Sequence, residues 1–154
     1  MPETLTRRKV VTVGDFVADV LVSIPRLPVE AARHQLAASI DIEPGGAGNF
    51  VIAGTRLGLD VTLLGVRGAD SFGATAAAAL EGEGIDTRGL VVQPEGTTTT
   101  VIVLADDAGQ HVFLGKYGSG PEVAFSPDWE AQVARADALF LSGYSLHEER
   151  LARA

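Results

Sequence analysis

Cysteine is absent from this sequence of 154 residues. Its absence excludes disulfides, thiolate metal sites and cysteine nucleophiles, and it suits the cytoplasm, where we expect the protein to reside. A continuous apolar run of about 18 residues is also missing, because Asp15 and Asp19 interrupt the longest candidate, "VVTVGDFVADVLVSI". We therefore expect no membrane span, and the N-terminal residues carry no pattern of a secretory signal.

Basic residues are few: 12 Lys and Arg stand against 20 Asp and Glu, which gives a formal net charge of −8. Proteins that bind nucleic acids neutralise phosphates with clustered Lys and Arg, so we expect no nucleic-acid partner. The three histidines, His34, His111 and His147, show no metal-binding spacing, and we expect no metal site.

Strand-like and helix-like segments alternate along most of the chain. Continuous apolar runs predict buried strands, and helical periodicity with good caps predicts the segments between them. For the first helix we expect Val51, Ile52, Ala53 and Leu57 to face inward. This alternation predicts an α/β fold with parallel pairing and right-handed crossovers. The expected strands are 9–15, 60–66, 89–93 and 137–143, and the expected helices are 49–57, 70–84 and 126–136, with Ser126 as an N-cap.

A second, smaller sheet is expected from segments that no helix follows. Residues 97–118 read as two strands joined by a turn, and shorter strand-like pieces lie near 20–27 and 36–43. We expect these segments to form a sheet separate from the parallel one.

Residues 44–50, "PGGAGNF", crowd three glycines around one asparagine. A phosphate-binding loop would need Gly-Lys-Ser/Thr after the glycines. A dinucleotide fingerprint would need a third glycine at position 51, and the whole motif would have to follow directly after the first strand. Neither pattern is present, which disfavours a nucleotide-binding oxidoreductase. The glycines are also compatible with a plain turn, and Asp15 and Asp19 with solvated carboxylates at a strand end.

Four blocks of the sequence, in register over nearly the whole chain, resemble the N-terminal part of the ribokinase-like, phosphofructokinase B type carbohydrate kinases. The most specific is "GGAGNFVIAGTRLGLDVTLLGVRG" (45–68), which departs from the signature only at Val51, where a small residue is usual. The others are "VGDFVAD" (13–19), "GADSFGATAAAALEGEGIDTRGL" (68–90) and "GQHVFL" (109–114).

The resemblance implies a mostly parallel sheet flanked by helices with a small β-sheet lid, residues 1–154 being the N-terminal part of such a domain. It implies transfer of the γ-phosphoryl group of ATP, with Mg²⁺, to a hydroxymethyl group of a sugar or nucleoside. Asp19, Gly45, Gly46 and Asn49 match substrate-binding positions. Asp70 is interpreted as tying a helix start. The lid sheet of related kinases also pairs two subunits, which implies a homodimer.

The family's catalytic Gly-Ala-Gly-Asp block is missing from the sequence, because Gly46-Ala47-Gly48 is followed by Asn49, which cannot serve as a base. We therefore expect no catalytic residue and no bound ATP in this chain alone, which we expect to be inactive by itself. The alternative is a non-catalytic sugar-binding or dimerising fragment. The capping box "SLHE" at 145–148, so close to the last residue, favours a truncated sequence over a natural fragment.

Overall fold

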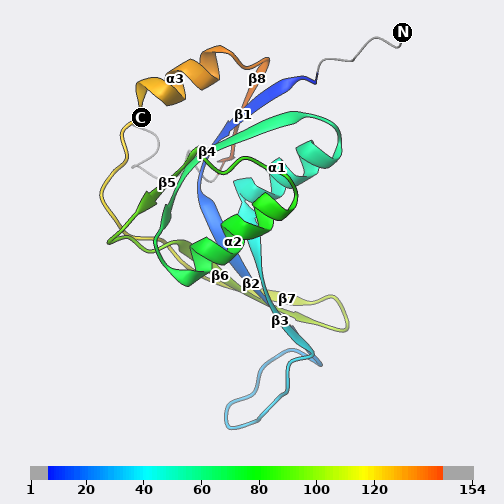
Figure 1. The fold of residues 1–154 in the computed structure, drawn as a ribbon. Helices are drawn as coiled ribbons and strands as arrows, with labels where there is room; N and C mark the ends of the chain where they lie inside the picture. Colours follow the sequence, from blue (N-terminus) through cyan, green and yellow to red (C-terminus); the bar gives the residue numbers. More distant parts are fainter. Residues whose placement is uncertain (1–6, 144–154) are drawn as a thin grey trace.

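The structure is a computed structural model that describes residues 7–143. This part of the chain folds into two four-stranded sheets, which we call sheet A and sheet B, and three helices (Figure 1). In chain order the elements are β1 (Lys9–Val13), β2 (Phe16–Ile24), β3 (Ser39–Gly46), α1 (Ala47–Arg56), β4 (Asp60–Gly68), α2 (Ser71–Gly82), β5 (Leu90–Gln93), β6 (Thr99–Asp106), β7 (His111–Lys116), α3 (Pro127–Ala134) and β8 (Ala138–Leu141).

Sheet A has the strand order β5-β4-β1-β8, and every neighbouring pair is parallel. Successive side chains of a strand point to opposite faces of the sheet. Accordingly, Val10 of β1 packs in one core cluster, whereas Val11 packs in another beside Leu64 of β4. The two central strands are thus buried on both faces, which is why they read as continuous apolar runs.

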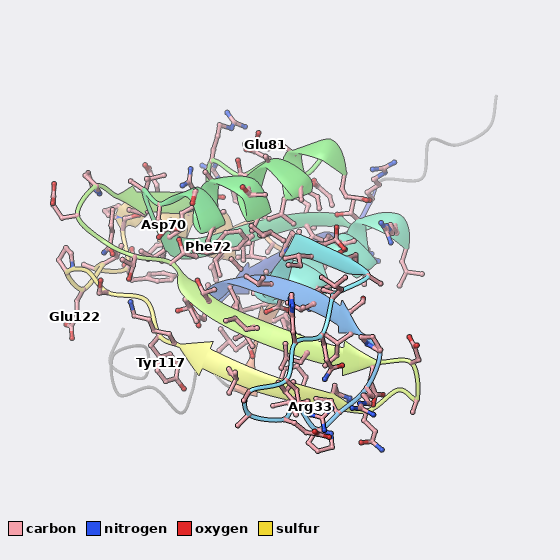
Figure 2. All side chains as sticks on the ribbon, turned by 90° about the horizontal axis from the view of Figure 1, so that it is seen from below. Arg33, Asp70, Phe72, Glu81, Tyr117 and Glu122 are labelled. Atoms are coloured by element: carbon pink, nitrogen blue, oxygen red, sulfur yellow. The ribbon has the colours of Figure 1, made fainter. Side chains whose placement is uncertain are left out.

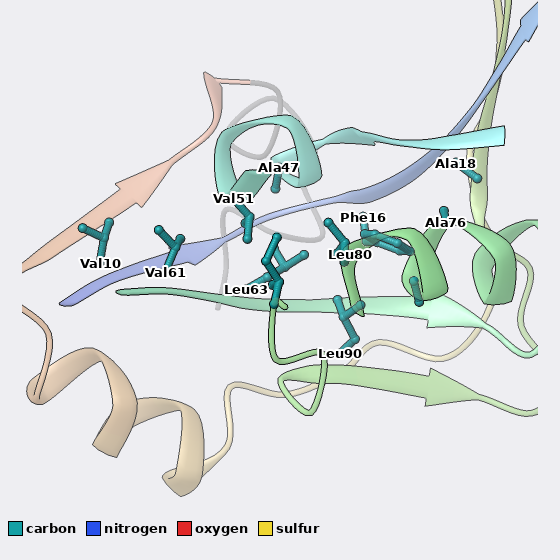
Figure 3. Close-up of a cluster of buried hydrophobic side chains, with 12 residues drawn as sticks. Val10, Phe16, Ala18, Ala47, Val51, Val61, Leu63, Ala76, Leu80 and Leu90 are labelled. Carbon is teal, nitrogen blue, oxygen red and sulfur yellow. The ribbon is translucent and has the colours of Figure 1, made fainter. Parts of the chain in front are cut away.

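The helices lie on both faces of sheet A. Val51 of α1 and Leu80 of α2 are fully buried in the larger cluster on one face (Figure 3). On the other face, Trp129 of α3 packs against Val11 and Leu64. The predicted α/β architecture with a parallel sheet flanked by helices is confirmed.

Sheet B has the strand order β3-β2-β6-β7, with β2 and β6 parallel and the two outer pairs antiparallel. It projects away from the helices, and the loop between β2 and β3 lies at its far end (Figure 1). Residues paired across strands share a face of the sheet. One face therefore carries Asp19 together with Glu43 and Val101. The opposite face, which we call the apolar face, carries Val20, Val22, Ile40, Ile42, Ile102, Leu104, Val112 and Leu114.

Two expectations about burial are wrong. Ala53 and Leu57 of the first helix are exposed, Leu57 by 82%, because the helix ends at Arg56 and Leu57 is its C-cap. Gly54 instead lies on the buried side, close to Val61. The strand 137–143 was expected to be buried, but all of β8 is exposed, because it is an edge strand of sheet A within the described residues.

The helix starts expected at Ser126 and Asp70 are confirmed. Ser126 caps α3, with its hydroxyl accepting from the Trp129 amide at 3.2 Å, and Asp70 caps α2 by accepting from the Gly73 amide at 2.9 Å. The capping box at 145–148 lies outside the described residues. Within 7–143, no helix is both long and apolar enough to cross a membrane.

Candidate functional site

The topology of sheet A indicates where a ligand binds. The chain passes from α1 to β4 on one side of β1 and from α3 to β8 on the other, with the two helices on opposite faces. The strand order therefore reverses beside β1. In open α/β sheets, ligands bind outside the carboxyl ends of the strands at such a reversal. In this chain, that point is where Gly14 and Asp15 lead from β1 into β2.

Asp19 and Gly45 lie against each other next to this point. Asp19 of β2 pairs with Glu43 of β3, and Gly45 pairs with Val17, so Asp19 and Gly45 are diagonal neighbours on one face. A Cβ atom built on Gly45 would collide with the Asp19 carboxylate. Glycine is thus needed at position 45 if the carboxylate is to rest directly on the backbone of β3.

The Asp19 carboxylate is held in a poorly solvated environment. Burial raises its pKa above the ordinary value, and the negative charge of Glu43 across the strand pair raises the pKa further. No hydrogen bond to its oxygens comes from residues 7–143. Hydrogen-bond donors such as hydroxyl groups would therefore stabilise this carboxylate if a ligand brought them.

Gly46 turns the chain from β3 into α1. Its φ of 54° is in the left-handed region, and a Cβ there would lie 2.9 Å from the Asp15 carbonyl oxygen. That oxygen accepts from the Ala47 amide at 3.3 Å, which closes the turn. The N-cap of α1 is Gly46 itself, which has no side chain to cap the helix, and the first turn holds no acidic residue.

Asn49 belongs to this first turn of α1, and its side chain is exposed. The structure therefore brings Asp19 into contact with Gly45 and joins Gly45 through Gly46 to the helix start. Asn49 follows within one helical turn. Gly45, Gly46 and Asn49 thus lie along the stretch where the chain passes from sheet B into α1, and Asp19 contacts the first of them.

Glu43 was missed by the sequence reasoning, although it faces Asp19 across the strand pair. A signal was present: Asp41, Glu43 and Gly45 alternate in "SIDIEPGG", and alternating residues share a strand face. An open apolar hollow of about 330 Å³ lies elsewhere, on the apolar face beside Leu104, Val112 and the loop at Leu27.

Two patterns typical of metal and phosphate sites are absent from the described residues. Among residues 7–143, no three His, Asp or Glu side chains lie close enough together to hold a metal ion. The glycine cluster lacks the lysine and hydroxyl residues of a phosphate-binding loop.

Comparisons with known proteins agree with this architecture. A family model described as pfkB family carbohydrate kinase matches residues 7–153. An ATP-dependent ribose-1-phosphate kinase of Halopiger xanaduensis is 28% identical over 134 residues, which cover 87% of this chain and 45% of that protein. A ribokinase of Haemophilus influenzae is 34% identical over 143 residues, with the same two coverages of 87% and 45%.

A solved structure shows the same fold. Arabidopsis thaliana ribokinase, complexed with ribose and ATP, superposes with a TM-score of 0.73 at 25% identity, covering 96% of this chain and 50% of that one. The chain thus spans about half the length of each of these three proteins.

Proposed function

Because this chain belongs to the pfkB family of carbohydrate kinases, we propose that it forms the substrate-binding and lid part of an ATP-dependent sugar or nucleoside kinase. The whole protein then transfers the γ-phosphoryl group of ATP to a hydroxymethyl group. The chain spans 45% of each of two curated relatives, so the reaction is proposed for the longer protein and not for this chain alone.

The contact between Asp19 and Gly45 is the observation that carries the proposal. A half-buried carboxylate with a raised pKa, resting on bare backbone, is a strong acceptor that is only partly solvated. Two vicinal hydroxyls of a sugar supply the donors that such a carboxylate needs. The proposed ligand is therefore a polyol rather than an anion, which the charges of Asp19 and Glu43 would repel.

The other residues complete the recognition of the sugar. The carboxamide of Asn49 both donates to and accepts from hydroxyls, and the glycines at 45 and 46 let main-chain amides approach the ring. Sheet B covers the sugar as a lid. Such a cover excludes water, which would otherwise compete as the acceptor of the phosphoryl group.

The phosphoryl-transfer chemistry is assigned to the part of the longer protein outside this chain. Support for this comes from residues 7–143, among which the glycine cluster lacks the pattern of a phosphate-binding loop and no three His, Asp or Glu side chains are grouped as metal ligands. The base that accepts the hydroxyl proton is also placed there, since no Gly-Ala-Gly-Asp block occurs in the sequence.

An ADP-release assay on the product of the complete reading frame tests the proposal, with ribose, fructose and inosine as acceptors. We expect turnover with at least one of them, and Asp19→Asn should raise its KM strongly. Asp60→Asn is the control. Asp60 lies at the start of β4, at the amino-terminal ends of the strands of sheet A, so the change removes the same charge far from the site and should leave KM unchanged. No turnover with any acceptor, or an unchanged KM for Asp19→Asn, would contradict the proposal.

Titration calorimetry on the 154-residue chain separates the alternatives. Binding of a sugar without binding of ATP supports a substrate-binding part that is inactive by itself. Binding of neither counts against the sugar site described above, and binding of ATP counts against placing the nucleotide site elsewhere.

The outer part of sheet B favours a second proposal, that two copies of the chain pair through it. Ile40 is 66% exposed and Leu114 is 57% exposed on the apolar face, and within residues 7–143 no helix covers this part. All of β7 is exposed at the sheet edge, where its free amides and carbonyls can pair with another strand. A self-complementary patch of this kind is typical of a two-fold dimer.

Sedimentation velocity on the chain tests the pairing. We expect a dimer that Leu114→Lys converts to a monomer, because the change places a charge in the apolar interface. Leu57→Lys is the matched control: Leu57 is exposed at the end of α1, away from sheet B, so the dimer should persist. A parent chain that sediments as a monomer at all concentrations would overturn this proposal.

A further inference from the structure

Two connecting segments that run between the sheets are joined to each other. Residues 94–98 lead from β5 into β6, and residues 117–126 lead from β7 to α3. Where they pass, the Thr97 amide donates to the Ser119 carbonyl at 2.9 Å, and the Ser119 amide donates back at 3.0 Å. Their hydroxyl oxygens lie 2.9 Å apart. We call this paired crossing the hinge bridge, because any rotation of sheet B against sheet A must move it.

One carboxylate fastens the hinge bridge to α2. Oδ1 of Asp70 accepts from the Gly73 amide at 2.9 Å, which caps the helix, while Oδ2 accepts from the Thr98 amide at 2.6 Å. Thr98 is 4% exposed, and its hydroxyl accepts from the Gly68 amide at 3.1 Å. Figure 2 shows Asp70 at the N-terminal end of α2, close to where the chain enters β6. Asp70 thus bonds two elements at once.

Gln93 provides a second, neutral fastening. Its side chain is almost fully buried, and its amide donates to the Pro121 carbonyl at 2.5 Å. Cβ atoms built on Gly96 or Gly120 would collide with its carboxamide, so both connecting segments pass directly over it. The hinge bridge therefore sits between the end of β5 and the start of α2.

The fastening is transmitted to the candidate sugar site by strand register. β6 begins at Thr99, next to Thr98, and Thr99 pairs with Val17 in the parallel β2–β6 ladder. Asp19 pairs with Val101 in the same ladder. A displacement of the start of β6 therefore displaces the strand that carries Asp19 relative to α1 and Asn49.

We propose that Asp70 is a positioning residue, whose Oδ2 holds Thr98 and thereby sets the placement of sheet B, and with it Asp19, over the carboxyl edge of sheet A. The consequence for sugar binding rests on the proposed function, whereas the placement of sheet B does not. Asp70 touches no substrate; it acts through Thr98 and β6.

The competing explanation is that Asp70 only caps α2, and Asp70→Ser separates the two. Serine is as good an N-cap as aspartate, but its single short hydroxyl cannot also reach the Thr98 amide. Asp70→Asn is the second variant, because one carboxamide oxygen satisfies only one of the two amides. Ser126→Ala is the matched control, since it removes the cap of α3 and leaves the bonds of Thr97 to Ser119 and of Asp70 to Thr98 intact.

The placement of sheet B is measured by the distance between two spin labels. The chain contains no native cysteine, so Ala78→Cys on α2 and Asp107→Cys in the β6–β7 turn, both exposed, give a single label pair. We expect the distance distribution to shift or broaden in Asp70→Ser and Asp70→Asn, and to stay as in the parent in Ser126→Ala. Calorimetry with ribose should show affinity weakened by about tenfold in the Asp70 variants alone, as loss of one hydrogen bond to a charged group would give.

Superimposable distance distributions for the parent and both Asp70 variants would overturn the inference, as would an equal change in Ser126→Ala. A parent chain that binds none of ribose, fructose and inosine would count against the proposed function alone, and the label distances would still decide the role of Asp70.

Discussion

Gly45→Ala is expected to weaken sugar binding strongly while leaving the fold nearly unchanged. The backbone at Gly45 is compatible with alanine, since its φ is not among the positive values. The three atoms nearest to the new Cβ all belong to the carboxylate of Asp19, with which it would collide. A short side chain can escape such a collision by changing its χ1 rotamer, and the carboxylate then no longer rests on β3.

The two effects differ in size. Overpacking that a rotamer change relieves costs about 1 kcal/mol, at the low end of its range, and removing a glycine from the unfolded chain returns about 0.5 kcal/mol. The net loss of about 0.5 kcal/mol lowers Tm by about 2 °C in a chain of this size. Displacing the carboxylate removes two charge-assisted hydrogen bonds of about 1.5 kcal/mol each, so ribose affinity should fall by about a hundredfold.

Thermal unfolding by circular dichroism and calorimetry with ribose measure the two effects. Gly115→Ala is the control in the same sheet, because a Cβ there meets only Val101, at an ordinary 3.6 Å, so neither Tm nor affinity should fall. Combined with Asp19→Ala, Gly45→Ala should weaken binding no further, since both act through one carboxylate. Gly45→Ala with unchanged affinity, or with an additive loss in the double variant, would refute the reasoning.

Two further predictions concern the charges of sheet B. Asp19→Asn should raise the Tm of the ligand-free chain at pH 7. Burial and Glu43 raise the pKa of Asp19, so the ionised carboxylate destabilises the native state once pH exceeds the ordinary value of 3.8. The gain in Tm should shrink as pH falls toward that value, and a lower Tm at pH 7 would contradict the prediction. Asp106→Asn should lower the Tm at pH 7. Burial alone would raise the pKa of Asp106, but amide hydrogen bonds from Leu27, Gln110 and Ala108 outweigh it and hold the pKa below 3.8, so the stabilisation is present above 3.8 and disappears as pH falls through the lowered pKa. Scanning calorimetry at neutral and acid pH checks both predictions. Asp107→Asn, at the neighbouring aspartate in the same turn, is the control and should leave the Tm unchanged at either pH.

Features that depend on local sequence were predictable. The parallel strands are continuous apolar runs, and the starts of α2 and α3 carry capping residues at the expected positions. Burial at element ends was not predictable in the same way. Leu57 continues the apolar pattern of α1 but falls on its C-cap, and the apolar β8 is exposed because burial depends on its neighbours in the sheet.

For the candidate site, the sequence predicted the residues that belong to a family motif, but not the contacts between them. Asp19, Gly45, Gly46 and Asn49 were identified by resemblance, whereas the repulsion between Asp19 and Glu43 follows from strand register, which no motif records. The bond from Asp70 to Thr98 joins residues that are 28 positions apart, so the cap was visible in the sequence and the second partner was not.

The parallel pairing of β2 with β6 has a consequence for synthesis of the protein. β2 is translated early and pairs with β3 at once, but its other neighbour begins only at Thr99, after β4 and β5. Until then the growing chain on the ribosome carries β2 and β3 as a two-stranded ribbon, whose inner end can pack against α2 but whose β2 edge is unpaired, a form that is marginal by itself and prone to wrong associations. The ribbon from β2 to β3 is therefore the segment of the nascent chain that a chaperone would be expected to shield.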